Sequence, residues 1–248
     1  MTPQSLDRFI NLLARNGEKV TPETAMLDFG CGEGSTVYAL VDRGFTNTCG
    51  FDAVDRIKYR SPEDCRRFHF GVTGGGLPFS NDSFDLVFSE EVFEHVHNQV
   101  PVWREIYRVM KPGGVAIHSF PGPYCLIEPH SYVPFGGVIV QYWWFKLWAL
   151  LGIRNEFQRE ANLNSTKTAR WNTFRAVENL NYISNSAYKV IWEDIGFEWK
   201  WLTQDSLDFH SRPIVRLIGR LNRALPIFGW CLRAFFSRKV LLRKPTSS

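Results

Sequence analysis

The sequence predicts an α/β fold, a doubly wound Rossmann-like sheet of seven strands that is mostly parallel and has an antiparallel last strand. Three observations predict it. Short apolar runs alternate with helical patterns along the chain, as they do in parallel sheets with helical crossovers. The first run ends in a glycine-rich loop, Gly30-Cys31-Gly32-Glu33-Gly34. The 248 residues can bury one substantial core, so we expect a single domain over residues 1–248.

The predicted strands are apolar or β-branched runs bounded by turn residues. They cover residues 25–29, 48–51, 67–72, 84–89, 115–120, 197–202 and 239–243. Helices are expected where apolar residues recur at three- and four-residue steps. These are residues 2–15, 35–43, 100–110 and 187–195. Lys111-Pro112-Gly113-Gly114 should end the third helix before the next strand begins.

Composition indicates a folded globular protein in a reducing compartment. Hydrophobic residues make up 44% of the chain and charged residues 22%. The five cysteines are an odd number without a C-x-x-C spacing, which argues against a disulfide framework or a zinc site. The N-terminus lacks a signal peptide, and the most apolar stretch, 138–153, is too short to span a bilayer. We therefore expect a cytoplasmic protein without a metal.

The net charge of +4 hides an asymmetry between the two ends of the chain. After Asp208 there are nine basic residues and no acidic one, which leaves a net charge of −5 on the first 208 residues. A basic, apolar tail on an acidic body suits a membrane surface or an anionic partner. No nucleic-acid-binding motif joins the basic residues, so nucleic acid is not an expected partner.

A nucleoside-binding site is predicted where the first two strands end. Ligands of open parallel sheets bind beyond the carboxyl ends of the strands, and glycines there let a ligand approach the backbone. A dinucleotide loop of the form G-x-G-x-x-G would need glycine at position 35, which is Ser35. Asp52 stands 18 residues after Gly34, where a carboxylate can accept hydrogen bonds from ribose hydroxyls. The alternative for Asp52 is a solvated turn residue.

Four motifs carry a family resemblance. They are Met26-Leu27-Asp28-Phe29-Gly30-Cys31-Gly32-Glu33-Gly34, Asp52, Leu77-Pro78-Phe79 with Phe84-Asp85-Leu86-Val87, and Lys111-Pro112-Gly113-Gly114. In order and spacing they resemble the class I S-adenosylmethionine-dependent methyltransferases, in particular the small-molecule, type 11-like group. The resemblance covers roughly residues 20–120, and the elements after residue 187 look like the antiparallel finish of that family.

The resemblance implies S-adenosylmethionine as the cofactor. The residues expected around it are Asp28, Gly30, Gly32, Gly34, Asp52, Ala53, Val54, Thr73, Ser89 and Glu90. The glycine loop would surround the methionine part, Asp52 would hold the ribose, and Ser89 and Glu90 would lie near the sulfonium. Thr73 occupies a position where the family often has an acidic residue. Adenine recognition would then fall to backbone groups or to the Thr73 hydroxyl.

The expected activity is methyl transfer to a small-molecule or lipid-linked acceptor, with oxygen as the preferred nucleophile. An alcohol acceptor loses a proton, and histidine suits the role of base near neutral pH. His130 follows the strand at 115–120 and is the leading candidate, and His95 is the second. A loop histidine bonded to backbone is the alternative for both. The alternative for the whole chain is a non-catalytic cofactor-binding scaffold or regulatory subunit.

Two insertions complete the prediction, and the oligomeric state stays open. Residues 121–180 form an active-site or substrate insertion whose aromatic segment includes Trp143, Trp144, Phe145 and Trp148. This segment either forms the core of a lid or lines an apolar acceptor pocket or membrane interface. Residues 205–238 form a basic helical insertion before the last strand. Its arginines are expected on one helical face (Arg212, Arg216, Arg220, Arg223) and its apolar residues on the other (Val215, Ile218, Leu221, Leu225). Such a helix either contacts an anionic membrane or packs on the sheet.

Overall fold

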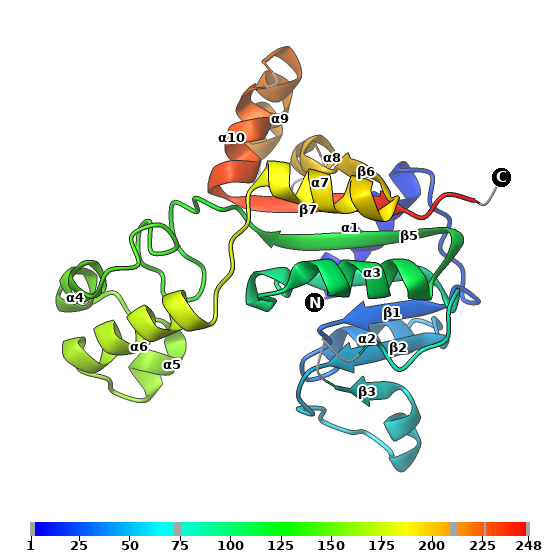
Figure 1. Cartoon of the computed structure of the whole chain (residues 1–248), viewed down its shortest axis with the longest axis horizontal. Coiled ribbons are helices and arrows are strands. Elements are labelled where there is room, and N and C mark those ends of the chain that lie inside the picture. The colour runs from blue at the N-terminus through cyan, green and yellow to red at the C-terminus, as the bar shows by residue number, and fades with distance from the viewer. Residues whose placement is uncertain (1–2, 72–75, 209–212, 226, 247–248) are drawn as a thin grey trace.

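The computed structural model describes residues 3–71, 76–208, 213–225 and 227–246, and it confirms the predicted fold class. Seven strands form one sheet in the order β3-β2-β1-β4-β5-β7-β6 (Figure 1). Neighbouring strands from β3 to β5 are parallel, and β7 is antiparallel to both β5 and β6. The strands are β1 (Met26–Phe29), β2 (Thr48–Asp52), β3 (Phe68–Phe70), β4 (Phe84–Glu90), β5 (Met110–Pro121), β6 (Glu198–Trp201) and β7 (Ser237–Arg243).

Helices cover both faces of the sheet and form two projections from it (Figure 1). Those on the sheet are α1 (Pro3–Arg15), α2 (Ser35–Val41), α3 (Gln99–Val109) and α7 (Asn185–Ile195), with short 3₁₀ turns at η1 (Pro62–Arg66) and η2 (Phe93–His95). The others are α4 (Tyr142–Leu150), α5 (Glu156–Glu160), α6 (Ser165–Glu178), α8 (Thr203–Asp208), α9 (Pro213–Ala224) and α10 (Ile227–Phe235).

The alternation of side chains along the strands builds two cores, one on each face of the sheet. On one face, Trp103 of α3 and Trp192 of α7 pack against strand residues such as Val87. On the other face, Phe9 of α1 packs against Phe88, with their ring centroids 5.2 Å apart. Val87 and Phe88 are consecutive and point to opposite faces, as the pleat of a strand requires. The buried sheet thereby holds its strand ends, and the loops that follow them, in fixed positions.

The Lys111-Pro112-Gly113-Gly114 segment differs from the prediction, because it lies inside β5 and does not separate a helix from a strand. The register between β4 and β5 shifts here, with Phe84 opposite Met110 but Leu86 opposite Val115. The segment is therefore a bulge that holds extra residues. Gly113 has a φ of +79°, and a Cβ on Gly114 would lie 2.8 Å from the carbonyl oxygen of Lys111. Both positions require glycine for this reason.

The first projection, which we call the α4–α6 lobe, is the chain between β5 and α7 that carries α4, α5 and α6 (Figure 1). It has a small core of its own around Val133, Phe145 and Ala169. Trp144 and Trp148 pack partly against that core, whereas Trp143 and Leu150 are exposed. The aromatic segment therefore serves as the core of the lobe on one side and leaves an apolar surface on the other.

The second projection, the α9–α10 hairpin, packs on α8 and stands away from the sheet (Figure 1). Gly219 is buried against Leu207 and Asp208, and Asn222 donates a hydrogen bond to Gln204. The inner face of α9 is thus made of small and polar residues. Leu221 and Leu225 are exposed, so the apolar face that the sequence predicts opposite the arginines is not packed on the sheet at these positions. Arg212 lies outside the described residues.

Arg238 in β7 joins the two ends of the chain segment that forms the α4–α6 lobe. Its guanidinium is buried and donates two hydrogen bonds to the carbonyl of Pro121, at 2.9 and 2.7 Å, and one to that of Ile183, at 2.7 Å. It also stacks between the rings of Phe120 and Tyr188. Burial lowers the pKa of Arg238 to about 10, which leaves it charged near neutral pH. This one side chain therefore fixes where the lobe leaves and rejoins the sheet.

We predict that Arg238→Met lowers the free energy of unfolding by roughly 2–5 kcal/mol, because two buried carbonyls lose a charged donor. Urea denaturation followed by circular dichroism measures this loss. Arg104→Met is the matched control, since Arg104 is exposed and makes one long ion pair of 3.8 Å with Asp194. A loss below about 0.5 kcal/mol in Arg238→Met, the range of ordinary surface changes, would contradict this role.

Candidate functional site

The glycine loop leaves β1 in a backbone conformation that only glycine adopts easily. Gly30 and Gly32 have φ angles of +83° and +55°. A Cβ on Gly30 would lie 2.3 Å from Val92 Cγ2, so the loop passes directly over the segment that follows β4. A Cβ on Gly32 would meet no atom within 4 Å, because that side of the loop is open. The loop therefore presents bare backbone to the space beyond the sheet.

Asp52 ends β2 beside this loop. Its Oδ2 accepts a hydrogen bond of 2.8 Å from the amide of Gly32, and its Oδ1 accepts one of 3.1 Å from the amide of Val54. The side chain is 10% exposed, and Arg56 lies 3.6 Å from Oδ1. The position is what the sequence predicts for a ribose-binding carboxylate, at the carboxyl edge of the parallel strands.

A cavity of about 780 Å³ opens between the loop, the end of β2 and the segment after β4. Five of the predicted site residues line it, namely Gly30, Gly32, Asp52, Ala53 and His95. Residues that the sequence did not single out also line it, among them Val92 and two residues from the end of the α4–α6 lobe, Arg175 and Asn179. The cavity lies where the fold predicts a ligand site, at the carboxyl edge of the sheet.

Four other predicted residues lie around this cavity without being among those that line it. Asp28 is buried in β1, and burial raises the pKa of its carboxyl to about 7. Gly34 begins α2 at a φ of +80° and faces Phe68, 2.8 Å from an added Cβ. Ser89 is buried, with its Oγ 2.7 Å from Nδ1 of His118. Val54 is exposed.

Two more predicted positions complete the set. Glu90 is exposed at the end of β4. Glu91 beside it has a φ of +55°, an uncommon conformation for a residue with a side chain. Thr73 lies outside the described residues.

His130 is held by a buried carboxylate in the loop between β5 and α4. Its Nδ1 lies 2.6 Å from Oε1 of Glu128, whose other oxygen accepts hydrogen bonds from the amides of His130 and Ser131. The hydroxyl of Tyr182 donates a further hydrogen bond of 3.0 Å to Glu128. Burial alone would raise the pKa of Glu128, but these donors lower it to about 2. A carboxylate at Nδ1 leaves Nε2 as the ring nitrogen of His130 that can act on a ligand.

His95 lies beside His130, with the two ring centroids 4.9 Å apart. Its Nδ1 is 3.1 Å from the carbonyl oxygen of Asn179, so its Nε2 is also the available nitrogen. Burial lowers the pKa of His95. Glu94 precedes it and is 1% exposed, and burial raises the pKa of this carboxyl to about 7. The sequence predicted the two histidines, and the fold adds the buried acid.

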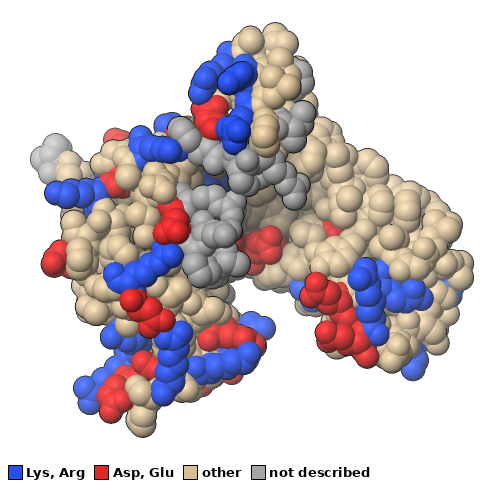
Figure 2. Space-filling model, turned by 180° about the vertical axis from the view of Figure 1, so that it is seen from behind, with Lys and Arg blue, Asp and Glu red and all other residues tan. Residues whose placement is uncertain are grey.

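A second cavity, of about 400 Å³, lies on the α4–α6 lobe next to His130. Its lining includes Tyr132, Phe157, Trp171 and Arg175. Arg175 also lines the first cavity, and it lies over the ring of Trp171 at 5.2 Å. Figure 2 shows the hollow between the body of the molecule and the lobe. The two histidines therefore lie where the first cavity and this partly aromatic cavity meet.

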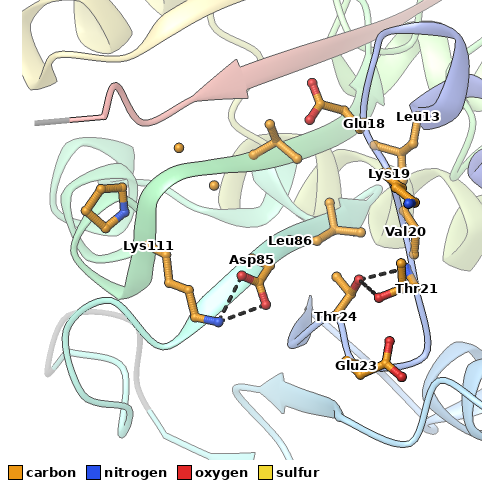
Figure 3. Close-up of a pocket in the computed structure, with 14 residues that line it drawn as sticks. Leu13, Glu18, Lys19, Val20, Thr21, Glu23, Thr24, Asp85, Leu86 and Lys111 are labelled. Atoms are coloured by element: carbon orange, nitrogen blue, oxygen red, sulfur yellow. Dashed lines mark hydrogen bonds and ion pairs between the residues drawn. The ribbon is translucent and has the colours of Figure 1, made fainter.

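A third cavity lies at the start of β4, beside the bulge of β5 (Figure 3). Lys111 reaches Asp85 there, with Nζ 2.8 and 2.9 Å from the two carboxylate oxygens. Asp85 also accepts a hydrogen bond from the amide of Ala25, which precedes β1. These contacts tie β1, β4 and β5 together. The motif at residues 111–114 thus has a structural role, far from the cavity that the fold predicts for a ligand.

The residues of the first cavity fit a nucleoside cofactor with an amino-acid tail. The loop around Gly32 offers unshielded backbone, and Asp52 offers a buried carboxylate for ribose hydroxyls. No described atom lies within 4 Å of a Cβ added at Gly32, so this side of the loop is open to a ligand. The fold and this cavity match what is expected of a class I methyltransferase domain.

Comparison with known proteins finds a methyltransferase segment within the chain. Residues 27–118 match the family model described as a methyltransferase domain. A solved S-adenosylmethionine-dependent methyltransferase from Mesorhizobium loti superposes with a TM-score of 0.53 at 13% identity, covering 92% of this chain and 94% of that one. At that identity the likeness concerns the fold.

Two curated relatives match in sequence. The chain is 32% identical over 121 residues to the 2-methyl-6-phytyl-1,4-hydroquinone methyltransferase of Synechocystis sp., covering 46% of this chain and 38% of the relative. It is 30% identical over 114 residues to the demethylmenaquinone methyltransferase of Tropheryma whipplei, covering 44% and 47%. The match thus spans less than half the length of either relative.

Two residues near the cavities were not predicted from the sequence, Glu94 in the body and Arg175 in the lobe. Glu94 has no local signal in the sequence, although it is buried in the fold. Arg175 lies in the predicted insertion, yet nothing in the sequence shows that α6 ends beside the glycine loop. Hydrogen bonds of Asn181 to the carbonyls of Val96 and His97, both at 2.9 Å, bring these segments together.

Proposed function

We propose that this protein transfers a methyl group from S-adenosylmethionine to a hydroxyl oxygen of a small-molecule or lipid-linked acceptor. One observation carries the proposal: the glycine loop and Asp52 form one cavity, and His95 and His130 stand where that cavity meets a second one. The matched family and the fold support the cofactor and the class of reaction. The second cavity supports an acceptor of small size.

The cofactor supplies an electrophilic methyl group on a sulfonium, so the protein has to orient the acceptor and exclude water. Asp28, Gly30, Gly32, Gly34, Ser89 and Glu90 are proposed around the methionine end. Asp52 is proposed to accept hydrogen bonds from the ribose, with Ala53 and Val54 against the adenine. Thr73 stays a prediction for the adenine contact, since it lies outside the described residues.

An apolar ring or chain bearing a hydroxyl fits the acceptor side. Tyr132, Phe157 and Trp171 offer aromatic surface around the second cavity, and Arg175 offers a charge that reaches both cavities. The two curated relatives are named for a phytyl hydroquinone and for demethylmenaquinone. These names and the aromatic lining support an apolar acceptor with an oxygen on a ring.

The proposal includes the catalytic roles that the sequence suggested for His130 and His95. His130 is proposed to act on the acceptor hydroxyl through Nε2, because Glu128 holds its Nδ1 at 2.6 Å. His95 is proposed to assist from the cofactor side, since it lines the first cavity. The non-catalytic alternative, a scaffold with a methyltransferase fold, would bind the cofactor and leave both histidines without effect on turnover.

We predict that Asp52→Ala weakens the binding of S-adenosylhomocysteine by roughly 1–3 kcal/mol, because charge-assisted hydrogen bonds to the ribose are lost. Isothermal titration calorimetry measures the affinity. Asp55→Ala is the matched control, since its carboxylate bonds Ile57 and Tyr59 and lies outside the lining of the cavity. Equal affinities for the folded Asp52→Ala protein and the wild type would reject the ribose role.

We predict that His130→Ala lowers turnover by about 10²- to 10⁴-fold while cofactor affinity changes little, because His130 is proposed to act on the acceptor and not on the cofactor. Transfer of a labelled methyl group to a panel of quinols and phenols measures turnover. His69→Ala is the control, since His69 packs on Phe79 and is not among the residues that line either cavity. Near-normal turnover in a folded His130→Ala protein would contradict the catalytic role and leave His130 as a structural loop residue bonded to its neighbours.

We also propose that the protein contacts anionic membranes peripherally, and the α9–α10 hairpin supports this. None of the helices in the described part of the chain is long and apolar enough to cross a bilayer. The outer face of α9 carries Leu217 and Leu221 beside Arg220, and Trp230 of α10 is 51% exposed. Basic residues beside exposed leucine and tryptophan suit the boundary between headgroups and hydrocarbon. Basic side chains gather on this projection in Figure 2.

We predict that the protein sediments with anionic vesicles and that Arg216→Gln with Arg220→Gln weakens this binding, since each basic residue near such a surface contributes roughly 1 kcal/mol. High salt should release the protein. Arg66→Gln with Arg104→Gln is the control, because it removes the same charge from the exposed surface of the body. Equal binding to neutral and anionic vesicles would exclude the electrostatic contact.

A further inference from the structure

Glu94 is a buried carboxyl group whose partner is missing from the described residues. The residue is 1% exposed, and neither carboxylate oxygen has a hydrogen-bond partner among them. Burying an ionised carboxylate without a partner is costly, so such groups are normally paired, protonated or bound to a metal. The surroundings of Glu94 decide between these states.

Two imidazoles face this carboxylate. One oxygen of Glu94, one ring nitrogen of His95 and one ring nitrogen of His130 all lie within 4.8 Å of one another. The Nδ1 atoms of both rings are already engaged, that of His95 with the carbonyl of Asn179 and that of His130 with Glu128. The Nε2 atoms are therefore the ones left for a common ligand.

The engaged nitrogens match the outer contacts of a metal site. Histidines that bind a metal through one nitrogen almost always donate the other N–H to a carboxylate or a backbone carbonyl, which fixes the ring and raises the basicity of the ligand. His130 has the carboxylate of Glu128 in this place, and Glu128 is itself held by the hydroxyl of Tyr182 at 3.0 Å. His95 has the backbone carbonyl.

We propose that Glu94, His95 and His130 bind a divalent cation of the first transition series. Two imidazoles and one carboxylate suit Zn²⁺, Fe²⁺ or Co²⁺, whereas Mg²⁺ and Ca²⁺ prefer oxygen ligands throughout. Three protein ligands leave a further position open, as catalytic sites require and structural sites do not. The cysteine spacing led us to expect a protein without a metal, and this proposal differs from that expectation. The three ligands come from segments that lie far apart in the sequence, so the sequence alone does not show the site.

Only a small adjustment brings the three ligands to bonding distance. Donor atoms around a four-coordinate ion, at about 2.0–2.1 Å from it, lie roughly 3.4 Å apart. The three donor atoms of the cluster lie within 4.8 Å of one another, so shifts of about 1 Å are enough to reach this spacing. His95 comes from η2 and His130 from the loop before α4, so a bound cation would join the body of the molecule to the lobe.

The open position faces the place where the two cavities meet, because His95 lines one and His130 the other. A cation there would lower the pKa of an acceptor hydroxyl bound to it, and the released proton would pass to solvent. This role rests on the proposed methyl transfer, whereas the cation site itself does not. In this role His130 binds the cation, and the cation, not a free His130 base, activates the acceptor hydroxyl.

The test is a titration of the full-length protein with Co²⁺ in the absence of cofactor, followed by visible absorption. We expect one equivalent to bind, with absorption bands typical of nitrogen and oxygen ligands, and Zn²⁺ to displace it. His95→Gln and Glu94→Gln should each lower the affinity by roughly 100-fold or more, since each removes a ligand. His97→Gln should bind like the wild type, because His97 is an exposed neighbour whose Nε2 bonds Glu178.

The outcomes separate the site from its function. Binding of less than half an equivalent, or unchanged affinity in the folded His95→Gln protein, would overturn the cation site. His95 is exposed, so that variant remains informative if Glu94→Gln does not fold. Cation binding without any methyl transfer would keep the site and contradict the proposed function. Methyl transfer that survives removal of the metal by a chelator would contradict the role of the cation in activating the acceptor.

Discussion

The hydrogen bond from the amide of Gly32 to the carboxylate of Asp52 is the contact on which the cofactor cavity depends. It spans 2.8 Å and joins the loop after β1 to the end of β2. The loop can make it because Gly32 adopts a positive φ, and because Gly30 leaves room for Val92. The parallel pairing of β1 and β2 begins with Met26 opposite Thr48 and ends with Phe29 opposite Phe51. The two strands therefore end side by side, which brings the glycine loop next to Asp52. A buried sheet therefore determines the cavity, and two glycines and one acid shape it.

The acceptor side depends on a different constraint, the attachment of the α4–α6 lobe. Arg238 binds the carbonyls of Pro121 and Ile183, the two points where the lobe leaves and rejoins the sheet. Asn181 then holds the end of the lobe against the segment that carries His95. These contacts bring His130 and Arg175 toward the glycine loop, although both are distant from it in sequence. The attachment of the lobe therefore sets the position of His130 relative to His95.

The strands and the cofactor loop were predictable because their signals are local. Apolar runs, turn residues and glycines each act within about ten residues, and all seven predicted strands are present. The bulge at Lys111-Pro112-Gly113-Gly114 was not predicted, since turn residues look alike whether they end a helix or lie inside a strand. Periodicity showed that α9 is amphipathic but not which side packs. Gly219 decides that, because its lack of a side chain lets α9 approach α8 and leaves Leu221 outside.

Non-local contacts explain what the sequence could not show at the site. Glu94 becomes a buried acid, and His95 and His130 become neighbours, only after the lobe has docked. The cofactor assignment itself is tested most directly by calorimetric titration of the purified protein with S-adenosylhomocysteine and, separately, with NADH. The account predicts stoichiometric binding of S-adenosylhomocysteine and none of NADH, because Ser35 stands where a dinucleotide loop needs its third glycine. Binding of NADH without binding of S-adenosylhomocysteine would contradict it.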